Sequence, residues 1–515
     1  MSQSLNLADW VVDRHVREGH GSRPALLAGD RAWTYDELPR LTNRAGNALA
    51  GLGVTRGDCV LLRLGTSLDC AVAFLGAMKI GAVPIPTSPL LREQEIRAVL
   101  ANSQAVLALA TPDLSDTIEA ARGASPRLGA VLLAGPSVRD PARSFHALLD
   151  QASDDLEAAP TQPDDPAFMM YTSGTTGEPK GVLHGHRWIV ATGGPITSAM
   201  LRLGPTDVCF QPQDWSFIYA LGCNLLFPLS AGAAVVVPAG RFDPGETCAT
   251  VERYGVTVFC AVPTIYRMLL AAFDAQTPAK LKSLRMGVSA GEPLPADTFR
   301  EWQERCGVTI HDGIGQTECH IFLANQFGAP VKPGSMGTPL TTWNVAILDD
   351  DGVPVPTGEP GHLVIRNDHP GLTLGYYRAP ERWADVNRAG WYYTKDFASV
   401  DKDGSYWYVS RSDDLIKSRG YLISPKEVES ALMEHPAVLE AGVVGVDDAI
   451  TGQKVRAFVT LRPGHEPAEA LAEEIRVHTR RLIAPYKAPQ EIRFVPELPK
   501  TLTGKVLRRA LRAEA

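Results

Sequence analysis

Residues 171–181 read Tyr-Thr-Ser-Gly-Thr-Thr-Gly-Glu-Pro-Lys-Gly, and this stretch guides the interpretation of the whole chain. Its glycines let backbone N–H groups turn toward one point, its hydroxyl groups add donors, and its lysine adds a positive charge. Apolar residues at 167–170 and 182–184 predict a strand on each side. A flexible surface turn is the alternative, and proline before the lysine does not fit the P-loop spacing. The composition favours a loop that holds a polyphosphate.

The overall composition limits the class of protein. At 515 residues the chain is too long for one hydrophobic core, so two or more domains are expected. A net charge of -8 argues against nucleic acid or an anionic membrane as the main partner. Eight cysteines without a CxxC pair indicate buried thiols in a reducing cytoplasm. The charged N-terminus and the lack of an 18-residue apolar run predict neither a signal peptide nor a membrane span, and His184 and His186 lack a zinc-ligand spacing.

Apolar runs that alternate with helical patterns predict parallel sheets with helices on their faces. These runs lie at 59–64, 82–85, 105–110, 130–133, 233–237 and 256–259, and a helix is expected over 67–80. After residue 337, turn residues at 349–352 and 401–404 and clustered aromatic residues predict short antiparallel strands. The sequence therefore predicts a large α/β N-terminal domain of mixed and parallel sheets, with a small β-barrel-like subdomain.

A domain boundary is expected near residues 411–414. Beyond it, Ser424, Pro425 and Glu427 predict the start of a helix, and residues 441–446, 454–461 and 491–495 predict strands. The predicted division is an N-terminal domain of residues 1–410, a hinge at 411–414 and a small mobile α+β domain of residues 415–515.

Four further segments accompany the loop, at residues 289–295, 313–318, 410–417 and 498–505. In order and separation, the five segments resemble the adenylate-forming superfamily of acyl- and aryl-CoA ligases, luciferases and peptide-synthetase adenylation domains. The resemblance spans nearly the whole chain, and residues 6–10 and 313–322 are similar to benzoate-CoA ligase and its aryl or medium-chain relatives. It implies a ligase that uses ATP, Mg²⁺ and coenzyme A to activate an aromatic or compact medium-chain carboxylic acid.

Two other functions stay open at this point. One is a stand-alone adenylation protein that loads a carrier-protein thiol instead of coenzyme A. The other is a non-catalytic nucleotide-binding regulator, against which the presence of Lys180, Glu318, Asp396 and Lys505 argues. The protein is expected to be a monomer or a homodimer.

The resemblance also implies roles for individual residues around the nucleotide. Thr317 would contact the α-phosphate and Glu318 would hold Mg²⁺. Ile314 stands where an aromatic residue is more common, so stacking on the adenine should be weaker. The residues expected to hold the β- and γ-phosphates are Thr172, Ser173, Gly174, Thr175, Thr176 and Lys180, and those expected to form the adenine wall are Gly291, Glu292, Pro293, Asp312, Gly313 and Ile314.

Later motifs are expected to serve the ribose and the second half-reaction. Asp396 would accept hydrogen bonds from the ribose hydroxyls beside Arg411, although a turn-capping aspartate is the alternative, and residue 395 is lysine where the family more often has glycine. By the resemblance, Lys505 would stabilise charge at the α-phosphate and then leave as the C-terminal domain rotates about Asp413. Gly420 would then line the pantetheine channel.

The acyl pocket is less determined by the sequence. Aromatic walls and small residues suit a flat ring or a modest alkyl group. Core packing is an equal alternative for Trp215 and Phe217, and a structural histidine is the alternative for His320. The candidates are Trp215, Phe217, Tyr219, Ala220, Gly222, Gly315, His320 and Ile321.

Overall fold

The computed structural model describes residues 4–173, 179–238, 240, 242–274, 277–412, 414–418, 421–448, 452–500 and 506–513. The chain divides into two compact units. The first comprises Met1–Asn344 and Arg366–Trp391, and the second comprises Val345–Ile365 and Tyr392–Ala515. The predicted division at 411–414 stays a prediction, because Asp413 lies outside the described residues.

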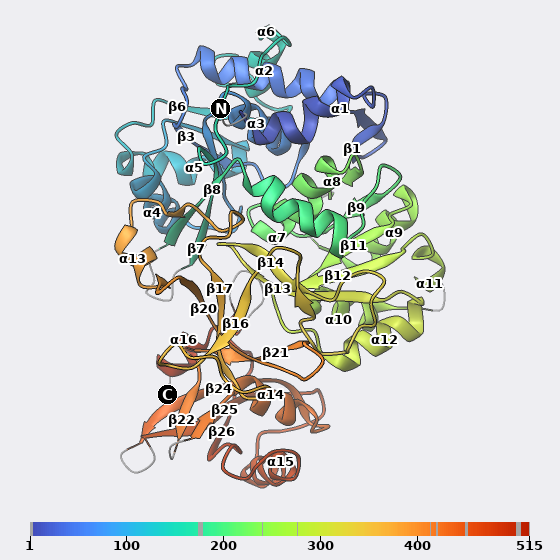
Figure 1. The fold of residues 1–515 in the computed structure, drawn as a ribbon, viewed down its shortest axis with the longest axis vertical. Coiled ribbons are helices and arrows are strands. Elements are labelled where there is room, and N and C mark those ends of the chain that lie inside the picture. The colour runs from blue at the N-terminus through green and yellow to red at the C-terminus, as the bar shows by residue number, and fades with distance from the viewer. Residues whose placement is uncertain are drawn as a thin grey trace. The chain divides into compact units, whose positions relative to one another are not determined.

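A nine-stranded sheet forms the largest part of the first unit (Figure 1). Its inner strands run parallel, because helices return the chain to the same edge of the sheet after each one. The strand order is β15 (Thr338–Pro339), β14 (His320–Ala324), β13 (Ile310–Gln316), β12 (Met286–Ala290), β11 (Val258–Ala261), β9 (Val208–Phe210), β10 (Ala234–Val236), β1 (Pro24–Ala28) and β2 (Arg31–Thr34). Both ends of the sheet are antiparallel, with β14 and β15 at one and β2 at the other.

Helices α9 (Pro244–Tyr254), α10 (Pro263–Ala272) and α12 (Ala296–Cys306) connect strands β10 to β13 and pack beside them (Figure 1). Their apolar faces meet the sheet around Phe259, Tyr266 and Trp302. The rings of Tyr266 and Trp302 lie edge to face with centroids 4.8 Å apart. This buried layer fixes the direction of β12 and β13, whose carboxyl ends carry two of the five motifs.

A second, four-stranded sheet lies in the same unit, and all its strands are parallel. Its order is β4 (Val83–Pro86), β3 (Cys59–Arg63), β5 (Leu107–Ala110) and β6 (Ala130–Leu133). Helices α3 (Leu68–Lys79), α4 (Glu93–Ser103) and α5 (Pro112–Ala121) link these strands. Helix α3 begins where Ser67 Oγ accepts the N–H of Cys70 at 3.1 Å, as is usual for a serine N-cap. The strands and the helix predicted over 59–133 are confirmed.

A third sheet of the first unit holds the glycine-rich segment between its strands. It comprises β7 (Pro166–Ser173), β8 (Pro179–Gly185) and β18 (Gly375–Tyr376), all antiparallel. The two strands predicted on either side of the loop are therefore confirmed. Strand β18 arrives from nearly 200 positions later in the chain, which no local pattern indicated.

The remaining elements of the first unit are the 15-residue helix α2, several short helices and one short strand. They are α1 (Arg14–Arg17), α2 (Glu37–Gly51), α6 (Phe145–Gln151), α7 (Ile218–Leu221), α8 (Phe227–Ser230), α11 (Thr277–Lys280), α13 (Pro380–Ala384) and β19 (Asn387–Arg388), with π-helical turns at Asp9–Asp13, Ile189–Gly193, Ile196–Met200 and Gly222–Leu226 and a 3-10 turn at Arg122–Ala124. Among the described residues, no helix has the length and apolar character needed to cross a membrane.

The second unit contains two sheets. One includes β16 (Val345–Leu348), β17 (Gly361–Arg366), β20 (Trp391–Val400) and β21 (Tyr406–Arg411), which are antiparallel at β16–β17 and β20–β21. The other has the order β23 (Tyr421–Ile423), β22 (Ile416–Ser418), β25 (Gly452–Leu461) and β24 (Val438–Asp448), with β26 (Glu491–Phe494) parallel to β25.

Helices α14 (Pro425–Met433), α15 (Glu469–Leu482) and α16 (Arg508–Ala513) complete this unit. Ser424 caps α14, as predicted. The guanidinium of Arg508 donates to both carboxylate oxygens of Glu429 at 2.6 and 2.7 Å, and to Asp414 at 3.2 Å. Glu429 Oε1 also accepts the N–H of Val443 at 2.9 Å. Helix α16 is therefore attached to the rest of the unit by a largely buried ion pair.

Candidate active site

The glycine-rich segment begins and ends on a pair of hydrogen-bonded strands. Thr172 on β7 lies opposite Lys180 on β8 in the antiparallel register. Gly181, the next residue on β8, packs closely against β7: a Cβ there would lie 2.6 Å from the sulfur of Met169. Gly174, Thr175 and Thr176 lie outside the described residues, and the side chain of Ser173 is likewise not described. Thr172 and Lys180, at the two ends of the loop, are thus held together by the sheet.

Tyr376 connects Lys180 to Glu318. Lys180 Nζ lies 3.3 Å from the Tyr376 hydroxyl and 4.5 Å from the centre of its ring. The same hydroxyl donates to Glu318 Oε1 at 2.7 Å. Three segments far apart in sequence therefore place a cation, a phenol and a carboxylate in one hydrogen-bonded chain.

Thr317 and Glu318 are fixed through their backbone as well. Strand β13 ends at Gln316, so both residues lie in the turn to β14. The Thr317 carbonyl accepts from Nε2 of His184 at 2.9 Å, and the Glu318 carbonyl accepts from the N–H of Thr373 at 2.7 Å. Glu318 is 8% exposed. Its carboxylate therefore has a fixed position and little contact with bulk water.

The two segments predicted to form an adenine wall are neighbours across a parallel strand pair. Ala290 on β12 lies opposite Gly313 on β13, so Gly291 follows one strand at the same edge as Ile314 on the other. Gly291 has a φ of +93°, which favours glycine. A Cβ on Gly313 would lie 2.7 Å from the carbonyl oxygen of Leu323. The chain therefore needs glycine at both positions for reasons of backbone shape.

Two carboxyl groups in these segments differ in burial: Glu292 is half-buried and Asp312 is buried. Glu292 accepts from the Thr264 hydroxyl at 2.9 Å through Oε2, and its Oε1 is buried without a partner. Asp312 is 5% exposed. Burial raises the pKa of Asp312 to about 8, against the effect of backbone hydrogen bonds from Leu294 and Gly313. Asp312 is therefore largely protonated near neutral pH.

Aromatic rings surround His320, where β14 begins. The ring centroid of His320 lies 4.7 Å from that of Phe227, 5.7 Å from that of Trp188 and 6.4 Å from that of Tyr219. A Cβ on Gly222 would lie 2.4 Å from Nε2 of His320, so the ring fills the space left by the missing side chain. We call Trp188, Tyr219, Gly222, Phe227 and His320 the ring cluster.

The imidazole of His320 is neutral. Its Nδ1 accepts the N–H of Ile321 at 2.8 Å, which leaves the ring proton on Nε2. Burial and, to a smaller extent, nearby His184 together lower the pKa of His320 to about 3. Burial likewise lowers the pKa of His184 to about 3. Nε2 of His320 and Nδ1 of His184 are both buried without a well-formed hydrogen bond.

The other acyl candidates separate into three groups. Gly315 pairs with Ile321 across the β13–β14 hairpin, and a Cβ on Gly315 would lie 2.3 Å from the carbonyl oxygen of His320. The Tyr219 hydroxyl donates to the carbonyl of Val288 at 3.0 Å, and Ala220 lies in the same turn of α7. Among the described residues, neither Trp215 nor Phe217 makes a ring contact with the ring cluster.

The predicted ribose residues belong to the second unit and contact each other. Asp396 on β20 lies opposite Arg411 on β21, and Arg411 Nη1 donates to Asp396 Oδ1 at 3.1 Å. Lys395 has a φ of +62°, in the left-handed region where glycine is favoured. The backbone of β20 just before Asp396 therefore has the conformation that glycine favours, although lysine stands there. Asp413, Gly420 and Lys505 lie outside the described residues.

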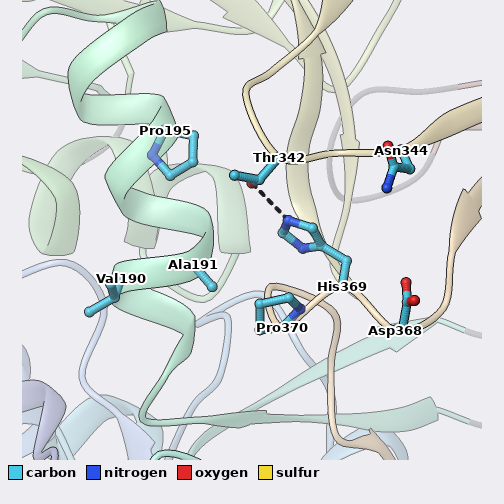
Figure 2. Close-up of a pocket in the computed structure, with 8 residues that line it drawn as sticks. All are labelled: Val190, Ala191, Pro195, Thr342, Asn344, Asp368, His369 and Pro370. Atoms are coloured by element: carbon cyan, nitrogen blue, oxygen red, sulfur yellow. Dashed lines mark hydrogen bonds between the residues drawn. The ribbon is translucent and has the colours of Figure 1, made fainter.

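A separate cavity of about 530 Å³ lies in the first unit (Figure 2). Val190, Ala191 and Pro195 on one side face Thr342, His369 and Pro370 on the other (Figure 2). Its described lining includes none of the residues predicted for the site. Thr342 has a φ of +80°, unusual for a β-branched residue, and its Oγ1 lies 3.0 Å from Nε2 of His369.

The sequence profile of the AMP-binding enzyme family matches residues 12–377, most of the chain. The chain belongs to the AMP-binding enzyme family. The profile of the AMP-binding enzyme C-terminal domain matches residues 427–505. The predicted resemblance to the adenylate-forming superfamily is thereby confirmed.

Individual relatives cover nearly all of this AMP-binding enzyme. It is 40% identical over 514 residues to benzoate–CoA ligase of Thauera aromatica, covering 99% of this chain and 96% of that one. It is 35% identical over 524 residues to acyl-coenzyme A synthetase ACSM3, mitochondrial, of Homo sapiens, covering 99% and 89%. The crystal structure of the anthranilate CoA ligase AuaEII in complex with anthranoyl-AMP matches with a TM-score of 0.91 at 35% identity, covering 100% and 98%. The predicted α/β fold class is confirmed, and the protein is an acid–CoA ligase of the AMP-forming type.

Sequence reasoning missed several residues of the site in this AMP-binding enzyme. Tyr376 carries no motif, and its position depends on the pairing of β18 with β8. His184 stood out in the sequence only as a possible metal ligand, and no pattern distinguishes Trp188 or Phe227 from ordinary core residues. A search for aromatic residues near a buried histidine could have found the last two only with knowledge of the fold.

Proposed function

We propose that this acid–CoA ligase activates a benzoate-like aromatic acid with ATP and transfers the acyl group to coenzyme A, with a compact medium-chain acid as the alternative substrate. The observation that carries the aromatic assignment is the ring cluster, whose central residue, His320, lies two residues beyond Glu318 in the chain. Flat aromatic walls around one polar group suit a flat ring with a polar substituent. The names of the benzoate and anthranilate ligases agree with this choice.

The first half-reaction joins the acid to AMP. A carboxylate oxygen of the acid forms a bond to the α-phosphorus of ATP, and the bond between the α- and β-phosphates breaks to release pyrophosphate. Two negatively charged groups must approach each other, so cations and N–H donors at the phosphates lower the barrier. In the proposal, Thr172, Lys180 and the loop between them hold the β- and γ-phosphates, while Thr317 contacts the α-phosphate.

Tyr376 is a positioning residue in this scheme. Its hydroxyl fixes one oxygen of Glu318 at 2.7 Å and lies 3.3 Å from Lys180 Nζ. It thus sets the distance between the cation proposed for the terminal phosphates and the carboxylate proposed for the metal. Preorganisation of this kind avoids the cost of rearranging charged groups during the reaction.

The donor set at Glu318 fits Mg²⁺. The carboxylate is a hard oxygen ligand, is 8% exposed, and has only one oxygen bonded to Tyr376. Mg²⁺ is usually held by one or two carboxylates together with substrate phosphates and water. When bound, the ion would neutralise part of the phosphate charge. We propose that Glu318 is the protein ligand.

The second half-reaction transfers the acyl group. The thiol of coenzyme A forms a bond to the acyl carbon, the carbon–oxygen bond to AMP breaks, and the thiol loses its proton. We propose that Lys505 acts on the first half-reaction and withdraws as the C-terminal domain rotates about Asp413. The proposal also places Gly420 beside the pantetheine and Asp396 with Arg411 at the ribose. The family match and the order of the motifs support these assignments.

A matched series of acids tests the substrate class. Benzoate, cyclohexanecarboxylate and hexanoate are compared in AMP release that depends on coenzyme A and Mg²⁺. The proposal expects the highest kcat/KM for benzoate, because a flat ring stacks on aromatic walls more favourably than a puckered ring or an alkyl chain. A higher value for hexanoate would overturn the aromatic assignment in favour of the medium-chain alternative.

The acyl acceptor needs its own experiment. With the best acid, thioester formation is compared between free coenzyme A and a carrier protein that bears phosphopantetheine. The proposal expects coenzyme A to be preferred. Preference for the carrier would favour the stand-alone adenylation function instead. Failure of every acid to exchange pyrophosphate would favour the nucleotide-binding regulator.

A further inference from the structure

The end of helix α1 brings two histidines together on the first unit. The N–H of His20 donates to the carbonyl of His15 at 2.8 Å, and the N–H of Gly19 donates to the carbonyl of Val16 at 3.0 Å. Gly19 has a φ of +79°. These bonds and the left-handed glycine form a Schellman motif, which reverses the chain after a helix. The ring centroids of His15 and His20 therefore lie 6.5 Å apart.

His15 has one nitrogen bonded and one without a partner. Its Nε2 lies 2.7 Å from the carbonyl of Leu229, which can only accept, so Nε2 carries the proton. Its Nδ1 is buried without a hydrogen-bond partner, and the whole residue is 4% exposed. A Cβ on Gly232 would lie 3.5 Å from Nδ1, so glycine at that position keeps a side chain from packing directly against the nitrogen. Nδ1 therefore presents a lone pair that no other described group uses.

Glu18 completes a three-residue group. One potential ligand atom from each of His15, Glu18 and His20 lies within 4.8 Å of the other two, the one such group among the described residues. The gap between Glu18 Oε2 and Nδ1 of His20 is 3.8 Å. Glu18 is exposed and His20 is partly exposed, so both can move the short distance needed to share an ion.

We propose that His15, Glu18 and His20 bind a Zn²⁺ ion. Two imidazole nitrogens and one carboxylate oxygen are a common zinc donor set, with water in the fourth position. Histidines that bind metals usually donate their second ring nitrogen to a carbonyl or carboxylate, as His15 does to Leu229. The ion would link His15, near the start of α1, to the turn that follows the helix. The site lies outside the predicted catalytic residues, so its role is stabilising.

Two nearby cations limit the affinity. Arg14 Nε lies 3.9 Å from Glu18 Oε1, and a guanidinium nitrogen of Arg23 lies 3.7 Å from the point where a Cβ on Gly232 would stand. Both repel a divalent ion, although Arg14 contacts the Glu18 oxygen that faces away from His20. Zinc should therefore bind more weakly than at an all-cysteine structural site, and the affinity should depend on salt.

Metal titration of the full chain tests the site. Zn²⁺ binding is measured by calorimetry, and Co²⁺ is used as a visible probe of tetrahedral coordination, for the wild type, His20→Ala, Glu18→Gln and His465→Ala. His465 is an exposed histidine elsewhere in the chain and controls for the loss of any histidine. We expect one Zn²⁺ per chain in the wild type and His465→Ala, and an affinity at least about tenfold lower in the other two.

Thermal unfolding supplies a second measurement. Added Zn²⁺ should raise the unfolding midpoint temperature of the wild type and of His465→Ala above the value measured in the presence of a chelator. It should not raise that of His20→Ala. AMP-release activity shows whether each variant is folded, because none of these residues belongs to the proposed catalytic machinery. Equal zinc affinity in the wild type and His20→Ala would overturn the proposal, and so would a wild-type chain that binds no zinc.

Discussion

Replacing Tyr376 by phenylalanine removes one hydroxyl from the centre of the proposed ATP site. The ring stays, so the contact with Lys180 Nζ at 4.5 Å from the ring centre is retained. What is lost is the 2.7 Å hydrogen bond to Glu318 and the longer 3.3 Å contact with Lys180. The substitution therefore tests whether the position of Glu318, and not the packing around it, matters for adenylation.

The expected magnitude follows from the strength of that bond. Hydrogen bonds to charged groups contribute about 1.5–3 kcal/mol, and each 1.36 kcal/mol in a barrier is about tenfold in rate. If the whole bond serves to hold Glu318, kcat/KM for adenylate formation falls about 10- to 150-fold. The longer contact with Lys180 adds less, because its geometry is weaker.

The assay separates the two half-reactions. Pyrophosphate exchange measures adenylate formation, and thioester formation from synthetic benzoyl-AMP measures the second step. Tyr254→Phe is the matched control, because its hydroxyl donates to the Gly29 carbonyl at 2.7 Å at the surface of the same unit. We expect Tyr376→Phe to lose exchange activity and to keep thioester formation. Exchange equal to that of Tyr254→Phe would refute the positioning role, and an equal fall in both steps would show a general loss of structure.

Three further predictions concern other parts of the chain. Lys505→Ala should lower adenylate formation about 10²- to 10³-fold and leave thioester formation from supplied acyl-AMP mostly intact; an equal loss in both assays would contradict the proposed division of labour. Gly222→Ala should reduce the free energy of unfolding by about 1–3 kcal/mol in urea titrations and lower kcat/KM for benzoate, because its Cβ would lie 2.4 Å from His320 Nε2; wild-type values for both would show that the ring cluster can adjust. Burial raises the pKa of Asp312 to about 8, so its protonated form favours the folded state at low pH and this contribution is lost as pH rises through that value. Asp312→Asn should therefore gain stability relative to the wild type between about pH 4, near the unfolded pKa, and about pH 8, whereas a constant difference would contradict the shift.

Local patterns in the sequence predicted the elements and the motif positions well. Three features follow from hydrophobic periodicity, turn residues and helix capping. They are the strands around residues 171–181, the parallel strands of the four-stranded sheet, and the capped start of α14. These features depend on neighbours within a few residues, so one sequence is enough. The family resemblance was also confirmed, because five motifs in order are far more specific than any one of them.

The connections between segments could not be predicted in this way. Tyr376 meets Glu318 because β18 pairs with β8, and His184 meets Thr317 because β8 lies beside the end of β13. Such contacts depend on tertiary packing, which leaves no local signal. The three-residue group at His15 escapes sequence reasoning for a different reason: its ligands meet through a helix-ending turn, whereas zinc motifs are recognised by regular spacings.

The last helix has a consequence for expression and engineering of the protein. Arg508 neutralises Glu429, whose side chain is 4% exposed, so loss of α16 would leave a carboxylate buried without its cation. Breaking such a pair from one side costs about 3–5 kcal/mol, a large part of the stability of a typical domain. A stop codon at or before position 508 would therefore produce an unstable chain, whereas a tag fused after residue 515 leaves this ion pair in place.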